Sequence, residues 1–403
     1  MKLAERTHPK WATPEMCLVL MAGAAPFSFS IWMALINNFA VEAASFTGKE
    51  IGILQSLREV PGFLSFTAVF VLLLIREQTF AILSLLTLGV GVAITGAFPS
   101  VLGIYATGVL MSIGFHYYET MQMSLSLQWL PQDVAPKALG KQISAKSIAS
   151  IGAYGLLWLI LNFFNLGYEW LYALGGGVTV IVALYVWAVF PRIDGAEAQH
   201  KHMVFRKRYW LYYALTFMGG ARRQIFIVFA GFLLVTKFGF SAAEVSGLYL
   251  INHLVTSFLA PKLGHLVIRF GERRALIFEY VGLILVFSAY AMVESSHAAG
   301  VVYVIDHLFF SFAIAQKSYL QKIAHPKDIA STSSVSFSIN HMAAVVIPAV
   351  FGTYLWVASP AYVFIAGALM AGVSLLLSLN VPRHPAPGEE VLWGRIAAPQ
   401  AAE

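Results

Sequence analysis

The sequence predicts an all-α integral membrane protein, and three observations lead to this fold class. Hydrophobic residues make up 59% of the 403 residues and charged residues only 11%, whereas soluble domains carry about 25% charged residues. The mean hydropathy is +0.73. Twelve apolar runs follow one another, each close to the roughly 20 residues that a helix needs to cross the hydrocarbon core. A chain with so little polar surface cannot cover a globule in water, which excludes a soluble enzyme.

The positions of the apolar runs predict twelve transmembrane helices in two sets of six. The runs cover residues 16–38, 51–75, 79–98, 100–130, 143–165, 169–190, 209–236, 243–268, 274–293, 300–321, 332–356 and 360–381. The longest polar interruption divides them six and six. We therefore expect four parts, which are an N-terminal six-helix bundle at 1–190, a cytoplasmic linker at 191–208, a C-terminal six-helix bundle at 209–381 and a disordered cytoplasmic tail at 382–403.

Two features of the first apolar run exclude a signal peptide and cysteine-based sites. The run continues for some twenty residues without a compelling cleavage site, so we interpret it as a retained transmembrane helix and not as a signal peptide. The single cysteine, Cys17, excludes an intramolecular disulfide and a cysteine-based metal site.

The basic residues predict the orientation of the chain. If both termini are cytoplasmic, twenty Lys and Arg residues, Lys146 among them, fall at the inner face and only Lys49 and Lys237 fall outside. Anionic lipids of the inner leaflet attract such cations, so the net charge of +6 requires no nucleic-acid partner. We expect a monomer in the lipid bilayer of a bacterial cytoplasmic (inner) membrane. Four cations remain within apolar runs, and they are Arg58, Arg222, Arg223 and Lys317.

A loop motif lies between the eighth and ninth runs. Its glycines permit a tight turn, and its cations hold the helix ends at the membrane surface. The motif consists of Gly264, Arg269, Gly271, Arg273 and Arg274. This spacing resembles the loop signature of the major facilitator superfamily. Ile268 occupies the position that is acidic in the family, and Glu279 is a candidate to replace that acid.

The resemblance implies a pseudo-symmetric six-plus-six fold without a cofactor. In that fold, the first, fourth, seventh and tenth helices line a central cavity, and the two halves rock about a site near the membrane midplane. The Gly-Pro pair of the family's antiporters is absent from residues 150–155. The fourth helix also lacks the arginine of many drug/proton antiporters.

The deepest cations predict the solute site. Arg222, Arg223 and Gln224 lie about fourteen residues into the seventh helix, a rise of ~21 Å, which places them past the middle of the membrane. Because a charge near the bilayer centre costs about 2.5–3.5 kcal/mol, these side chains should face a cavity or a partner. The alternative is an arginine that only holds a neighbouring helix through a carboxylate. The other predicted solute-binding residues are Arg58, Tyr117, Gln122, Lys317 and Asn340, although Lys317 is equally placed to reach the inner surface.

Titratable residues at membrane depth predict proton coupling. His116 and Glu119 are three residues apart and share a helix face, and a carboxylate beside an imidazole can exchange a proton during transport. A hydrogen-bonded pair without any protonation change is the alternative. Asp306 lies eleven residues before Lys317, so both face the same side of one helix at different depths. The other proton-coupling candidates are His307, Glu59 and His341. Arg58 and Glu59 are adjacent and point about 100° apart, so we expect each to serve a different neighbour.

These residues together predict a secondary active transporter for a small polar, anionic solute, coupled to protons. Arginine suits the bidentate recognition of carboxylate or phosphate. A multidrug exporter of the same fold is one alternative, since aromatic residues and methionines can form an adaptable pocket. A transition-metal carrier is another, with His116, Glu119, His253, His307 and His341 as candidate ligands. Neither the HExxH zinc pattern nor a phosphate-binding loop nor a nucleophile elbow is present, so we do not expect an enzyme.

Overall fold

The fold comes from a computed structural model, which describes residues 13–129, 135–190, 205–309, 312–325 and 329–394. Within these residues the chain is helical and has no β-strand apart from one isolated bridge. The described parts of all predicted apolar runs are helical. The predicted linker at 191–208 lies mostly outside the described residues.

Ten helices among the described residues are long and apolar enough to cross a membrane. This agrees with an all-α integral membrane protein. The predicted runs at 51–75 and 243–268 are also helical but are not among these ten. The twelve-span topology and the cytoplasmic termini therefore remain predictions.

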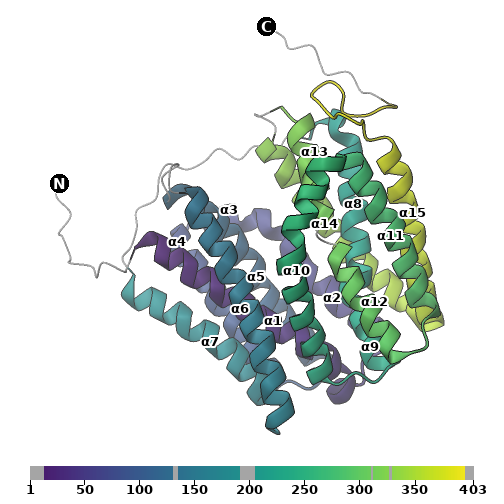
Figure 1. Ribbon diagram of the computed structural model, residues 1–403. Helices are drawn as coiled ribbons and strands as arrows, with labels where there is room; N and C mark the ends of the chain where they lie inside the picture. The colour runs from purple at the N-terminus through teal and green to yellow at the C-terminus, as the bar shows by residue number, and fades with distance from the viewer. Residues whose placement is uncertain (1–12, 130–134, 191–204, 310–311, 326–328, 395–403) are drawn as a thin grey trace, which may run out of the picture. The chain divides into compact units, whose positions relative to one another are not determined.

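The chain divides into two compact units, which are described separately (Figure 1). The first unit comprises Met1–Ser45, Leu57–Gln199 and Ser241–Leu250, and the second comprises Phe46–Ser56, His200–Phe240 and Ile251–Glu403. The start of α2 thus clusters with the second unit and the start of α10 with the first, whereas the sequence places each in the other half. The clustering follows helix packing and not the position of the linker.

The first unit is built on tight helix crossings. Its elements are α1 (Pro14–Ala44), the end of α2 (Gly48–Phe63), η1 (Leu64–Thr67), α3 (Ala68–Val71), α4 (Glu77–Thr95), α5 (Val101–Trp129), α6 (Ala135–Phe163) and α7 (Tyr168–Val189). Helix α1 begins where Thr13 caps the N–H of Met16 at 3.2 Å and Pro14 takes the first helical position. Helix α4 packs against α5 and α7. At the crossing with α7 a side chain on Gly176 would overlap the α4 backbone at Gly89 and Ala93, so only glycine allows this approach.

In the second unit, π-helical segments follow directly on two α-helices, α8 and α14. Its elements are η2 (Lys207–Tyr209), α8 (Trp210–Gln224), the π-helix η3 (Ile225–Ala230), α9 (Gly231–Thr236), most of α10 (Ala242–Phe270), α11 (Glu272–Met292), α12 (Ser296–Phe309), α13 (Ala313–Ile323), α14 (Ile329–Val350), the π-helix η6 (Phe351–Trp356) and α15 (Pro360–Leu379). Helix α11 packs against α15, and α8 packs against α14 and α15 (Figure 1). π-helical turns are rare and frequently occur at functional sites.

The described part of the predicted disordered tail is folded. Residues 382–394 return to the second unit, where Val391 is 1% exposed, and Pro387 and Gly388 occupy the centre of a turn in which Glu389 N–H donates to Ala386 O at 2.9 Å. Gly388 has φ +87°, as the third residue of a type II turn requires. The expectation of disorder is therefore wrong for these residues, while 395–403 lie outside the described chain.

Substitution of two adjacent glycines tests the α4–α7 crossing. We expect Gly176→Ala to lower stability by about 1–3 kcal/mol, because its methyl group would overlap the α4 backbone. Gly177→Ala is the matched control, since a methyl group there meets nothing within 4 Å and adds the same helix propensity. Thermal unfolding of both variants in detergent measures the difference. Equal melting temperatures would contradict the described crossing.

Candidate functional site

A cavity of about 560 Å³ lies within the second unit. It is formed by α8, η3, α11, α12, α13 and α14. Its lining residues are Tyr212, Thr216, Gly219, Arg222, Arg223, Phe226, Glu279, Leu283, Phe287, Asp306, Phe309, Ala313, Gln316, Lys317, Leu320, Gln321, Ser336, Phe337 and Asn340. This size is within the range of pockets that hold small organic ligands. Of the predicted solute-binding residues, the cavity brings together Arg222, Arg223, Lys317 and Asn340.

A buried ion pair lies in the wall of the cavity. Arg222 Nη2 on α8 donates to Glu279 Oε1 on α11 at 3.1 Å, and both side chains are less than 10% exposed. The guanidinium also lies over the ring of Tyr280, with the carbon Cζ 4.8 Å from the ring centroid. Glu279 thus compensates the charge of Arg222. This pair agrees with the alternative interpretation, in which an arginine holds a neighbouring helix through a carboxylate. The sequence does not identify Glu279 as that carboxylate and offers it only as a candidate to replace the loop acid.

Arg223 is held by an amide. Its Nη2 donates to Asn340 Oδ1 on α14 at 2.8 Å. Helix α14 can approach α8 here because Gly220 has no side chain, since a Cβ on Gly220 would lie 2.8 Å from Asn340 O. The bond to Asn340 orients the guanidinium of Arg223, which lines the cavity.

Helix α13 adds further polar groups to the cavity. Gln316 Nε2 donates to Thr216 Oγ1 on α8 at 2.8 Å. Lys317, the next residue, is exposed and lines the cavity. The predicted arrangement, in which Lys317 and Asp306 face the same side at different depths, agrees with both lining the cavity.

Asp306 is a buried acid in the lining of the cavity. It is 1% exposed, and neither carboxylate oxygen has a hydrogen-bond partner among the described residues. Burying a carboxylate charge without a partner is costly. The neighbouring His307 points elsewhere, with its ring centroid 5.9 Å from that of Phe226 and 6.0 Å from that of His253. Asp306 and His307 therefore do not act as one group.

Besides His307, the predicted residues Gln224 and His341 of the second unit lie outside the cavity lining. Gln224 is fully buried, and its amide atoms have no hydrogen-bond partner among the described residues. It is turned about 100° from Arg223 on the same helix. His341 is also buried, and its Nδ1 lies 2.9 Å from Phe337 O. Neither residue adds to the cavity wall.

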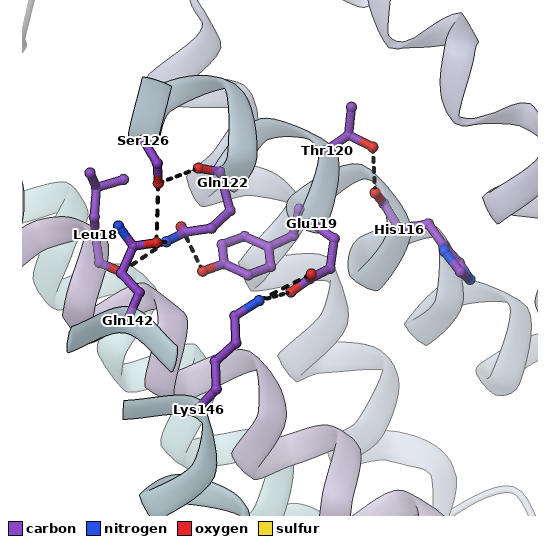
Figure 2. Close-up of polar contacts among 9 residues, drawn as sticks. Leu18, His116, Glu119, Thr120, Gln122, Ser126, Gln142 and Lys146 are labelled. Atoms are coloured by element: carbon purple, nitrogen blue, oxygen red, sulfur yellow. Dashed lines mark hydrogen bonds and ion pairs between the residues drawn. The ribbon is translucent and has the colours of Figure 1, made fainter. Parts of the chain in front are cut away.

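The first unit contains a hydrogen-bonded polar network around Gln122 (Figure 2). Tyr118 Oη donates to Gln122 Oε1 at 2.8 Å, and Gln122 Nε2 donates to Leu18 O at 3.0 Å and to Gln142 Oε1 at 2.9 Å. Ser126 Oγ donates to the same Gln142 oxygen at 3.1 Å. The network joins α5 to α1 and α6, so Gln122 serves helix packing in this structure. Tyr117, on the same helix, shares a hydroxyl contact with Thr67.

Glu119 pairs with a lysine and not with His116. Lys146 Nζ on α6 lies 2.8 Å and 3.1 Å from the two Glu119 carboxylate oxygens (Figure 2). The ring of His116 packs edge-on against Phe115. The predicted His116–Glu119 pair is therefore replaced by an interhelical pair, and Lys146, which the sequence assigned to the inner-face loops, is a site residue that it missed. The sequence carries no clear signal for this pair, because the predicted apolar run begins at 143, whereas the observed helix begins at Ala135 and places Lys146 eleven residues into it.

Arg58 and Glu59 pair with each other. Arg58 Nη2 donates to Glu59 Oε1 at 2.6 Å, and both side chains are buried. The guanidinium lies within 5.9 Å of the ring centroids of Phe29 and Trp32. The expectation that adjacent residues are poor partners is wrong here, because the long Arg58 side chain bends back to reach its neighbour. Arg58 is thus compensated within the first unit.

The loop motif adopts the predicted turn. Gly271 has φ +83° and separates α10 from α11, and Arg269 lies over the ring of Phe270. The acid at this end is Glu272, which is buried and bonds Lys322 at 2.6 Å and Ser318 at 2.7 Å. Gly264, Arg273 and Arg274 lie in the flanking helices. The motif therefore carries its ion pair at Glu272 and within one unit.

Comparison with known proteins gives a family and a fold. Residues 17–348 match the sequence model of the Major Facilitator Superfamily. The fold is similar to that of the nucleoside transporter NupG, with a TM-score of 0.70 and 15% identity over 91% of this chain and 97% of that one. It is also similar to a bacterial homologue of the human lysosomal transporter Spinster in an inward-facing and unoccupied conformation, with a TM-score of 0.71 and 15% identity over 91% and 95% of the two chains. Among curated proteins, none matches the sequence significantly.

Proposed function

The chain belongs to the major facilitator superfamily, and from this we propose that it is a secondary active transporter for a small polar, anionic solute, coupled to protons. The solute binds in the cavity of the second unit and crosses the membrane by alternating access. The observation that carries the proposal is the gathering of three cationic side chains, Arg222, Arg223 and Lys317, in the lining of one cavity. Arg222 pairs with the Glu279 carboxylate, and Arg223 Nη2 donates to the amide oxygen of Asn340.

The anionic class of the solute follows from this charge balance. Arg223 offers a planar fork of N–H donors, which suits a carboxylate or a phosphate. Lys317 adds a second positive charge to the same cavity. The side chains of Gln316 and Asn340 supply neutral hydrogen-bonding groups next to these cations. A solute with one anionic group and further polar atoms would satisfy this set.

Proton coupling is assigned to Asp306. A buried carboxylate without a hydrogen-bond partner in the described chain is stable only if it gains a proton or a bound cation. Glu119 is a weaker candidate, because Lys146 already compensates its charge. The proposal also retains the predicted twelve-span topology, cytoplasmic termini and a monomer in a bacterial inner membrane, which rest on the distribution of basic residues.

A neutral heteroaromatic solute is a second candidate. The aromatic residues Tyr212, Phe226, Phe287, Phe309 and Phe337 line the cavity, and rings of this kind pack against planar ligands. The structurally similar NupG is described as a nucleoside transporter. An uptake assay should also include lipophilic cations and divalent metals, the solutes of the multidrug and metal-carrier alternatives.

Uptake into proteoliposomes tests the anionic solute. We expect transport of at least one member of a labelled panel of mono- and dicarboxylates and phosphate esters, and about tenfold or greater loss in Arg223→Leu and in Lys317→Leu, since hydrogen bonds to charged groups contribute about 1.5–3 kcal/mol. Lys237→Gln is the control, because Lys237 bonds Val293 O outside the cavity. Uptake restricted to nucleosides, lipophilic cations or divalent metals would contradict the proposal.

Substitution of Asp306 tests the proton assignment. In Asp306→Asn, which preserves shape but cannot ionise, we expect uptake to lose its dependence on an imposed pH gradient while solute exchange without a gradient persists. The same measurement on Glu119→Gln should show the gradient dependence intact. A loss of coupling in Glu119→Gln, with Asp306→Asn unaffected, would reverse the assignment.

A further inference from the structure

Helix α13, Ala313–Ile323, carries part of the cavity and lies with α12 in one candidate membrane span, Ser296–Ile323. Its first half presents Gln316 and Lys317 to the cavity. The position of these two side chains depends on the contacts that hold α13.

One anchor of α13 comes from the loop motif. Glu272, at the start of α11, accepts hydrogen bonds from Ser318 Oγ at 2.7 Å and from Lys322 Nζ at 2.6 Å. The Glu272 side chain is only 2% exposed. Residues 318 and 322 are one turn apart, so the carboxylate holds one face of α13.

A second anchor comes from the C-terminal segment, residues 380–394, which we name the strap. Tyr319 on α13 is buried, and its hydroxyl donates to Glu390 O of the strap at 2.5 Å. In Figure 1 the strap is the yellow segment that follows α15 and lies at the ends of α8 and α13. Trp210 Nε1, at the start of α8, donates to Gly394 O at 3.1 Å. The strap thus connects α13, α8 and α15 at one end of the unit.

Asn380, the C-cap residue of α15 and the first residue of the strap, bonds to the other end of the strap. Its Nδ2 donates to Trp393 O at 3.1 Å, its Oδ1 accepts from Trp393 N–H at 2.6 Å, and its backbone O accepts from Leu392 N–H at 3.0 Å. The adjacent Val381 and Val391 are buried. These bonds close the strap into a loop that returns to the residue where it starts.

We propose that the strap positions α13 and, through it, the Gln316 and Lys317 side of the cavity, with Tyr319 and Asn380 as positioning residues. The proposed effect on the cavity rests on the proposed function, whereas the docking of the strap on α13 does not. Release of the strap frees α13 to move by about 1–2 Å or more, the size of helix shifts that accompany switching in proteins. The C-terminal segment is therefore part of the transport machinery and not a passive tail.

The proposal can be tested without any solute. The chain has one cysteine, Cys17, so a Cys17→Ser protein accepts spin labels at chosen sites. Ile314→Cys on α13 and Leu369→Cys on α15 are both exposed positions outside the cavity lining. Pulsed electron paramagnetic resonance of the full chain in lipid nanodiscs measures the distance distribution between the two labels.

We expect Tyr319→Phe and Asn380→Ala each to broaden this distribution or shift its mean by about 1–2 Å or more. Because both act through the strap, the double variant should show no larger change than the stronger single one. Tyr290→Phe is the matched control for Tyr319→Phe, since Tyr290 is a buried tyrosine whose hydroxyl has no hydrogen-bond partner among the described residues. Ser378→Ala is the control for Asn380→Ala, because the Ser378 hydroxyl donates to Leu375 O within α15.

Three results would overturn the proposal. These are unchanged distributions in both strap variants, equal changes in the controls, or additive changes in the double variant. Melting temperatures of the same proteins separate a shift of α13 from general unfolding. A failure of solute uptake in proteoliposomes with altered distances in the strap variants would reject the proposed function and leave the strap proposal standing.

Discussion

Ionised side chains inside an apolar helical bundle need compensation, and this constraint organises both units of the protein. In the first unit, Arg58 pairs with Glu59 and Lys146 with Glu119. In the second, Arg222 pairs with Glu279. Removing one partner of a buried pair leaves an uncompensated charge, which is far more costly than removing both. Of these pairs, Arg222–Glu279 joins α8 to α11 and Lys146–Glu119 joins α6 to α5, whereas Arg58–Glu59 lies within α2.

The cavity of the second unit brings together Arg223, bonded to Asn340, with Lys317 and with Asp306, whose carboxylate has no hydrogen-bond partner among the described residues. We propose that a solute anion and a proton bind to this set. The strap is linked to this cavity, because it bonds to α13, the helix that carries Lys317.

The sequence predicts where the helices lie better than it predicts which side chains pair between them. Hydropathy locates apolar runs without any knowledge of packing, so helices appear where they were expected. Ion pairs between helices depend on which faces meet, and the spacing that favoured His116 with Glu119 could not show Lys146 on the next helix. The strap was missed because prolines were interpreted as a sign of disorder, although Pro387-Gly388 followed by Val391 and Trp393 is also typical of a turn that returns an apolar segment to the protein.

We propose that Arg222 and Glu279 form a structural pair and leave solute binding to Arg223 and Lys317. A double-mutant cycle tests it most directly, with unfolding in detergent and solute uptake measured for Arg222→Gln, Glu279→Gln and the variant that carries both. We predict that each single substitution lowers stability by about 3–5 kcal/mol, and that the double variant recovers most of this loss and still transports. A double variant whose loss equals the sum of the single losses, or one that folds well but no longer transports, would contradict the claim.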